Sequence, residues 1–89
     1  MRYIAFIHKD PDSCYGVSFP DMPGCASAGD TLDEAVANAV DALSGHVRVM
    51  DMDGDQIPAA RNLEEIIADP RLAEDREGAL LSAIALVKD

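Results

Sequence analysis

Four aspartates in the first 30 residues have the side chains that metal-dependent nucleases use: Asp10, Asp12, Asp21 and Asp30. Such carboxylates cleave RNA by sharing two metal ions about 3.5 to 4 Å apart, which requires them to project from the middle of a strand and from facing helices. Here the first two flank a proline, the third lies between two more prolines, and the fourth precedes a helix start. These positions are turns, so we expect no metal site and no catalytic residue among them.

Three further aspartates, Asp51, Asp53 and Asp55, have the spacing with which a calcium-binding loop opens. The rest of that loop is missing. Its sixth position is Gln56, where the sharp turn needs glycine, and its twelfth is Asn62, where a bidentate glutamate is needed. We therefore interpret this run as the solvated end of a helix.

The residues that could act as soft ligands or nucleophiles are Cys14, Cys25, His8 and His46. None of them form the close pairs, such as C-x-x-C, that structural zinc sites use. A Cys–His nucleophile needs a thiolate in an electropositive pocket, and neither cysteine has a basic neighbour in sequence. His8 alternates onto the face of Ile4 and Phe6, which is typical of a histidine at the rim of a core. These residues indicate a protein that is not an enzyme and carries no cofactor.

The charge of the chain favours a protein partner. Seventeen Asp and Glu against seven Lys and Arg give the 89 residues a formal net charge of −10, which repels phosphate backbones. We therefore expect no direct binding of nucleic acid by this chain. The same field attracts a positively charged protein and speeds the encounter with it.

The composition limits both the core and the location of the protein. Two Phe, two Tyr and no Trp leave a mainly aliphatic core, whose modest stability would gain from oligomerisation. Two cysteines are too few for a secreted disulfide framework, and the N-terminus lacks the apolar stretch of a signal peptide. The longest uncharged apolar run, residues 78–87, is about half of the ~20 residues that span a bilayer. We expect a single cytoplasmic domain over residues 1–89 that does not enter membranes.

Alternation and turn residues predict strands at both ends of the chain. Residues 2–8 are apolar on both alternating faces, as in a strand that is covered on both sides. Residues 15–19 alternate with a period of two, and the Pro- and Gly-rich run after them closes that strand. Residues 25–29 form a weaker third strand, and residues 79–87 form the last one.

A capping box in which Thr31 is followed three residues later by Glu34 begins a long helix. Apolar residues then recur at steps of three and four, which predicts a core-facing stripe of Leu32, Val36, Val40, Leu43, Val47 and Met50. Asn62 caps a short second helix over residues 63–68, which Pro70 ends. The order is βββα(α)β, an α+β fold: a three-stranded antiparallel meander, one long helix packed on one face, and a C-terminal strand.

A longer motif carries a family resemblance. The run YGVSFPDMPGC from Tyr15 ends a strand in aromatic-Pro-Asp-x-Pro-Gly-Cys, and GDTLDEA follows from Gly29. In this pattern, and over essentially the whole chain, the sequence resembles the HicB family of antitoxins. The motif is mainly structural, because its prolines and glycine set a turn and its threonine caps a helix. Its residues are Phe19, Pro20, Asp21, Pro23, Gly24, Cys25, Gly29, Asp30 and Thr31.

The resemblance implies a partial ribonuclease H-like domain without a catalytic carboxylate cluster. In the ribonuclease H-like order the C-terminal strand is expected to run parallel to the first. Such a domain neutralises HicA, a small basic ribonuclease that acts on mRNA, and we expect it to do so by covering the RNA-binding surface of the toxin. Longer members of the family continue past the last strand into a ribbon-helix-helix or helix-turn-helix module that binds operator DNA. This sequence ends at Lys88-Asp89, either as a piece of a longer chain or as a solitary HicB-like protein, so operator binding by these residues is not expected.

Two other interpretations stay open: a weak metal-dependent nuclease of ribonuclease H-like fold, and a small oligomeric regulator without a toxin partner. The uncharged run 78–87 predicts a homo-oligomer, because it would lie at the free edge of the sheet, with Leu81, Ile84 and Leu86 at the oligomer edge. The short helix at 63–68 can cover the second sheet face only in part. We therefore expect a residual apolar patch ringed by carboxylates as the docking surface for a basic protein.

Overall fold

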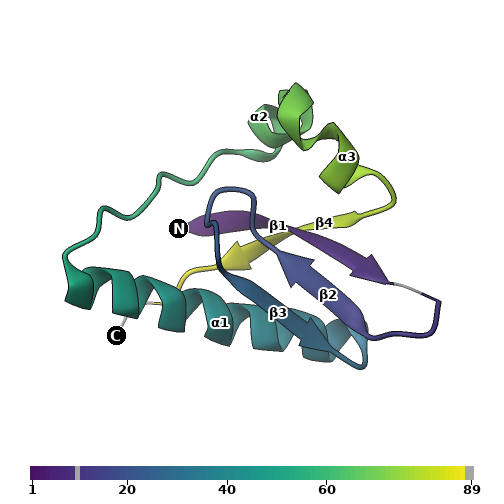
Figure 1. The fold of residues 1–89 in the computed structure, drawn as a ribbon, viewed down its shortest axis with the longest axis horizontal. Helices are drawn as coiled ribbons and strands as arrows, with labels where there is room; N and C mark the ends of the chain where they lie inside the picture. Colours follow the sequence, from purple (N-terminus) through teal and green to yellow (C-terminus); the bar gives the residue numbers. More distant parts are fainter. Residues whose placement is uncertain (10, 88–89) are drawn as a thin grey trace.

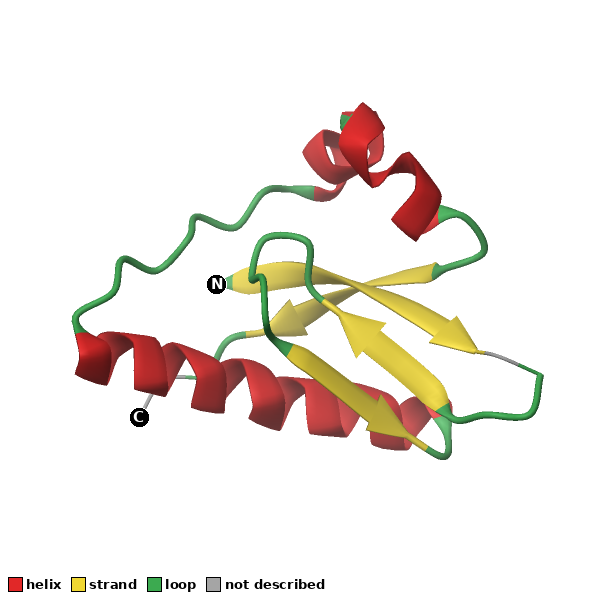
Figure 2. Cartoon of the chain, viewed as in Figure 1, coloured by secondary structure: helices red, strands yellow, loops and turns green. Residues whose placement is uncertain are grey.

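A four-stranded sheet with helices on both faces forms the protein in a computed structural model that describes residues 1–9 and 11–87 (Figures 1 and 2). The elements follow in the order β1 (Arg2–Lys9), β2 (Tyr15–Ser18), β3 (Ala26–Gly29), α1 (Leu32–Asp53), α2 (Leu63–Ala68), a 3₁₀ turn η1 (Pro70–Leu72), α3 (Ala73–Arg76) and β4 (Leu80–Ala85). This arrangement confirms the expected α+β class. Within the described residues, none of the helices combines the length and the apolar character that a membrane span requires.

β1 is buried on both faces, as its two alternating sets of apolar residues predict. Tyr3, Ala5 and Ile7 join the main core, to which α1 contributes, whereas Ile4 and Phe6 belong to a second, smaller cluster. In the sheet order β3-β2-β1-β4, β1 also has a hydrogen-bonded neighbour on each side. It is therefore the most enclosed strand of the sheet.

β4 runs antiparallel to β1, with Tyr3 opposite Ile84 and Ile7 opposite Leu80, so the expectation of a parallel last strand is wrong. The physical reason lies in the connection between the last helix turn and β4. α1 returns the chain along the sheet, and residues 54–79 then pass to the second face and lead the chain back to the opposite end (Figure 1). β4 consequently starts beside the end of β1 instead of beside its start.

α1 begins at the expected capping box, in which Thr31 Oγ1 accepts a hydrogen bond of 3.1 Å from the backbone N–H of Glu34. It ends at Gly54, whose φ of 75° lies in the left-handed region that favours glycine. Its buried line consists of Ala35, Ala39, Leu43 and Val47. The predicted stripe is thus wrong at its start: the side chain of Leu32 is exposed, and Val36, Val40 and Met50 only flank the buried line.

A close approach between α1 and β3 explains why alanines occupy this line. A Cβ atom on Gly29 would lie 2.4 Å from the backbone nitrogen of Ala35 and 2.8 Å from the carbonyl carbon of Glu34. The start of the helix and the end of β3 are therefore in direct backbone contact. Only residues with little or no side chain permit such a contact, so size decides the buried face here and hydrophobicity does not.

The second sheet face has a smaller cover. Ile66 of α2 is fully buried and packs against Ile4 and Phe6, with Leu72, Ala79 and Leu81 around them. Asn62 and Glu65 form a complete capping box at the start of α2, which confirms the predicted helix over 63–68. η1 and α3 were not predicted, because elements of three and four residues are too short to show a helical period. This cover contacts β1 and β4 and leaves the outward side of β2 and β3 open.

Gly29→Ala is expected to lower the free energy of unfolding by about 1 to 3 kcal/mol, because the added Cβ forces α1 away from β3. Urea unfolding followed by circular dichroism measures the change. Gly16→Ala is the matched control: it is also a strand glycine, but nothing lies within 4 Å of the position of its Cβ. The control should change stability by less than about 0.5 kcal/mol. Equal losses in both variants would show that the contact does not limit the packing.

Candidate functional site

The motif from Phe19 to Cys25 forms the corner between β2 and β3. Two consecutive turns close it, since the N–H of Met22 donates to the carbonyl of Phe19 and the N–H of Cys25 to that of Met22, each at 3.1 Å. Every third residue, Phe19, Met22 and Cys25, is consequently buried. Gly24 has a φ of 87°, which its turn requires and which other residues rarely adopt. This part of the motif builds and packs the corner.

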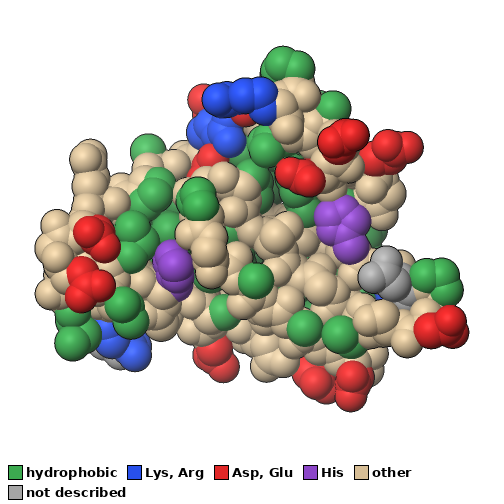
Figure 3. Space-filling model, viewed as in Figure 1, with side chains coloured by type: hydrophobic (Ala, Val, Ile, Leu, Met, Phe, Trp, Pro, Cys, Tyr) green, Lys and Arg blue, Asp and Glu red, His purple; other side chains and the backbone are tan. Residues whose placement is uncertain are grey.

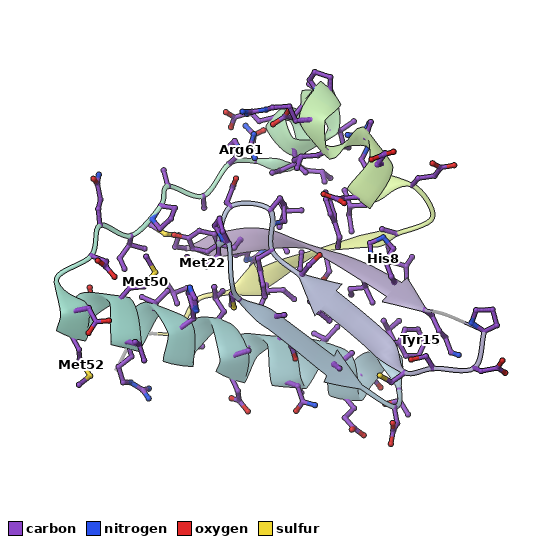
Figure 4. All side chains as sticks on the ribbon, viewed as in Figure 1. His8, Tyr15, Met22, Met50, Met52 and Arg61 are labelled. Carbon is purple, nitrogen blue, oxygen red and sulfur yellow. The ribbon has the colours of Figure 1, made fainter. Side chains whose placement is uncertain are left out.

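Asp21, in the same corner, is buried and binds Arg61 on the connection that follows α1. Arg61 donates its backbone N–H to Asp21 Oδ2 at 2.8 Å and its Nε–H to Oδ1 at 2.7 Å. It also donates from Nη1 to Asp69 at 2.8 Å, and Arg71 donates to the same carboxylate from Nε and Nη2. We call Asp21, Arg61, Asp69 and Arg71 the Arg61 clasp. It ties the connection to the β2–β3 corner, where Figure 4 shows Arg61 above Met22.

The clasp determines the electrostatics of this region. The hydrogen bonds from Arg71 and Arg61 hold the pKa of Asp69 well below its ordinary value of 3.8. The hydrogen bonds that Arg61 makes to Asp69 and to Asp21 raise the pKa of Arg61. Burial, and then the charge of Asp21, raise the pKa of Tyr3, whose hydroxyl donates to the carbonyl of Pro58 and so ties the connection to β1. Asp21 therefore serves the fold, because its oxygens are occupied by Arg61.

The other carboxylates that were considered as metal ligands lie apart from Asp21. Asp12 and Asp30 are exposed, and Asp10 lies outside the described residues. Asp51 and Asp53 form the exposed last turn of α1, which agrees with their interpretation as a solvated helix end. In the part of the chain that the structure describes, no three His, Cys, Asp or Glu side chains come together in a way that could hold a metal ion.

Two of the four cysteine and histidine side chains line the same hollow, which the sequence alone does not predict. Cys25 and His46 both line a depression of about 300 Å³ between α1 and the β2–β3 corner. Burial raises the pKa of the Cys25 thiol, whereas a nucleophilic cysteine needs its pKa lowered. Cys14 is exposed and His8 lies near the end of β1. The hollow therefore lacks the electrostatics of a thiolate active site.

The outward side of β2 and β3 is the part of the sheet that the helices leave uncovered. Ser18 and Gly16 of β2 lie opposite Ala26 and Ala28 of β3, and His8 of β1 lies opposite Gly16. We call Gly16, Ser18, Ala26, Ala28 and His8 the open face. A shallow hollow of about 310 Å³ lies over most of it. Figure 3, which views the molecule from this side, shows few charged side chains in the middle, acidic side chains around much of the rim, and Lys or Arg side chains at its top and lower left.

The open face suits contact with a protein. Apart from the imidazole of His8 its side chains are small, and they include no carboxylate, ammonium or guanidinium group, so the backbone of a partner can approach closely. An uncharged centre inside a charged rim is the usual anatomy of a protein interface. Sequence reasoning predicted a residual apolar patch ringed by carboxylates. It did not predict these small residues, because exposed Gly, Ser and Ala give no apolar signal.

β4 forms the other edge of the sheet, where three residues were expected to lie at an oligomer edge. Ile84 is fully buried in the main core, Leu81 is half-buried against the Phe6 cluster, and Leu86 is half-buried against the main core. Their side chains thus contribute to the monomer. The outer edge itself consists of backbone groups and of the exposed side chains between these residues.

The fold is that of a small α+β domain whose buried carboxylates are held by arginines. A sequence model of the family described as "HicB_like antitoxin of bacterial toxin-antitoxin system" matches residues 3–84. The chain belongs to this HicB-like antitoxin family, which confirms the resemblance seen in the motif.

Known proteins similar to this chain include a phage protein and two solved structures. An uncharacterised 14.9 kDa protein of Haemophilus phage HP1 is 46% identical over 70 residues, which are 79% of this chain and 52% of the phage protein. The Burkholderia pseudomallei antitoxin HicB has a TM-score of 0.82 at 33% identity, over 97% of this chain and 63% of that one. A chain of a HicA3–HicB3 toxin–antitoxin complex has a TM-score of 0.79 at 31% identity, over 99% of this chain and 100% of that one. The chain thus spans about half the length of the phage relative.

Asp69→Asn is expected to lower the free energy of unfolding near neutral pH, because the clasp loses its shared carboxylate. The folded pKa of Asp69 lies below its ordinary 3.8, so this stabilisation is present above that pH and is lost as the pH falls toward the folded pKa. The stability difference between wild type and variant should therefore narrow from neutral pH to about pH 2. Urea unfolding at several pH values tests this, with the exposed Asp12→Asn as control. A difference that does not change with pH would contradict the role of the charge.

Proposed function

We propose that this chain is an antitoxin-type binding domain that neutralises a basic, HicA-type ribonuclease by covering the RNA-binding surface of that enzyme with its open face. The observation that carries the proposal is the uncovered and uncharged sheet surface inside an acidic rim. Membership of the HicB-like family and the full-length similarity to a chain of a HicA3–HicB3 complex support it.

The proposed mechanism requires binding and no chemistry. A ribonuclease that acts on mRNA presents Lys and Arg to the phosphates, so its substrate surface is positive. The formal charge of −10 attracts that surface from a distance, and the small side chains of the open face then let the two backbones come close. RNA is excluded because the antitoxin occupies the same surface. In this proposal the domain is not an enzyme and meets its partner in the cytoplasm, where mRNA is found.

The rate of association with the toxin is expected to fall markedly from low to high salt, while the dissociation rate changes less. The reason is that the acidic rim acts over a Debye length of about 8 Å at physiological ionic strength, whereas the uncharged centre acts only in contact. Stopped-flow mixing with a purified HicA-type toxin, at several salt concentrations, measures both rates. An on-rate that is independent of salt would remove the electrostatic part of the proposal, and no binding at all would remove the antitoxin function.

Ala28→Lys is expected to weaken toxin binding by at least about 10-fold, which corresponds to about 1.4 kcal/mol. The exposed alanine lies in the open face, where a bulky cation would both hold the partner away and repel a basic surface. Binding is measured by calorimetry, and function by rescue of cells that express the toxin. Ala83→Lys is the matched control, since it adds the same side chain to an exposed alanine of the opposite edge strand. Equal effects of the two variants would place the toxin elsewhere.

A further inference from the structure

Gly16 of β2 is a glycine that neither the backbone conformation nor the packing of the monomer requires. Its φ is not positive, whereas Gly24, Gly54 and Gly78 have φ values of 74° to 87°. A Cβ atom added to Gly16 would find nothing within 4 Å, whereas one on Gly29 would meet the backbone of α1. Glycine inside a strand is less stable than alanine, because it loses more conformational freedom on folding. The monomer therefore gains nothing from the missing side chain at Gly16.

The position of Gly16 in the sheet indicates where the missing side chain matters. Gly16 pairs with His8 of β1 on one side and with Ala28 of β3 on the other. This row faces away from α1, because the adjacent residues Ile7 and Val17 belong to the main core and side chains alternate between the two faces of a strand. We call the space over Gly16, between the side chains of His8 and Ala28, the Gly16 notch. Gly16 and His8 both line the hollow of about 310 Å³ on the open face.

The Gly16 notch offers a flat surface and few hydrogen bonds. β2 lies between β1 and β3 in the sheet, so its backbone N–H and C=O groups are directed at those two strands. The part of the backbone that a partner can reach is therefore the exposed face of the peptide planes beside Gly16. Aromatic side chains cover strand glycines in this way within sheets. A strand glycine also marks places where another molecule approaches the backbone closely.

Charge favours an aromatic ring over an arginine at the Gly16 notch. A guanidinium group is also flat, and a basic partner has many of them. The residues of the open face, however, include no carboxylate, so a guanidinium placed there would lose water without gaining an opposite charge. An aromatic ring brings no charge, and it can pack against the imidazole of His8 in a stacked or edge-to-face arrangement.

We propose that Gly16 determines which partner the open face accepts, because an aromatic side chain of the toxin lies in the Gly16 notch beside His8. This inference rests on the proposed antitoxin function and deepens it. The charge of the domain attracts any basic protein, so it discriminates poorly among them. The Gly16 notch discriminates by shape, since only a partner that presents a ring at this position fills it. Aromatic side chains in such central pockets carry much of the binding energy of an interface.

Substitutions of Gly16 in the full chain test the proposal, with a purified HicA-type toxin as the probe. Gly16→Val should weaken binding by about 10-fold or more, because its side chain occupies the space of the ring, and Gly16→Ala should weaken it less. Stopped flow should show faster dissociation at an unchanged association rate, equally at low and high salt, since no charge changes. Urea unfolding should show Gly16→Val to be at least as stable as the wild type, because valine favours strands. A loss of binding together with a loss of stability would indicate a merely structural role and overturn the proposal.

The toxin side of the contact is identified by double-mutant cycles. Each surface aromatic residue of the toxin is changed to alanine and combined with the wild-type domain and with Gly16→Val. One of these residues should lose its contribution to binding in the Gly16→Val background, because its ring no longer has the Gly16 notch to occupy. Coupling of Gly16 to an arginine of the toxin, or to no aromatic residue, would overturn the assignment of an aromatic ring.

Gly45→Ala is the matched control. Gly45 also has nothing within 4 Å of the position of its Cβ, and it lies in α1 at the hollow beside Cys25, outside the open face. This variant should bind the toxin as the wild type does. A Gly16→Val variant that binds as tightly as the wild type would overturn the role of Gly16 and leave the proposed antitoxin function in place. A wild type that does not bind the toxin would instead remove the proposed function, and this inference with it.

Discussion

The enclosure of β1 is the constraint from which the rest of the structure follows. All five residues from Tyr3 to Ile7 are buried, so the strand needs cover on both faces and a neighbour on each side. A helix of 22 residues covers one face, whereas helices of only six and four residues cover the other face. The second cover therefore extends over β1 and β4 only, and the outward side of β2 and β3 is exposed as a direct result.

The acidic residues divide into two groups with different physical roles. Asp21 and Asp69 are mostly withdrawn from water and neutralised by arginines, where they hold the connection after α1 in place. Most of the others lie in solvent, where their summed field extends beyond the surface. The same residue type thus fixes the scaffold at one place and attracts a partner at another. Neither role requires the convergent geometry that catalysis would demand.

Local signals in the sequence were sufficient to predict where the helices and strands lie. Contacts between residues far apart in the chain leave no such local signal. Thr31 and Asn62 identified the starts of both predicted helices, because a cap depends on residues three positions apart. The direction of β4 was predicted wrongly from the ribonuclease H-like order, and hydrophobic periodicity could not correct it because it carries no information on where a connection leads the chain. The buried line of α1 was predicted at the wrong residues, because Val36 and Val40 are more hydrophobic than Ala35 and Ala39. Only the alanines, however, fit against Gly29. The pairing of Asp21 with Arg61 joins residues 40 positions apart, and no local pattern predicts it.

The pairing of β1 with β4 joins the first strand of this domain to its last strand. While the chain emerges from the ribosome, β1 lacks one of its two neighbours until translation has passed residue 85, and the cover of its second face is also incomplete until shortly before then. A nascent or prematurely ended chain would therefore expose Ile4 and Phe6 and remain available to chaperones and proteases. The topology thus makes synthesis of the domain through β4 a condition for its native fold.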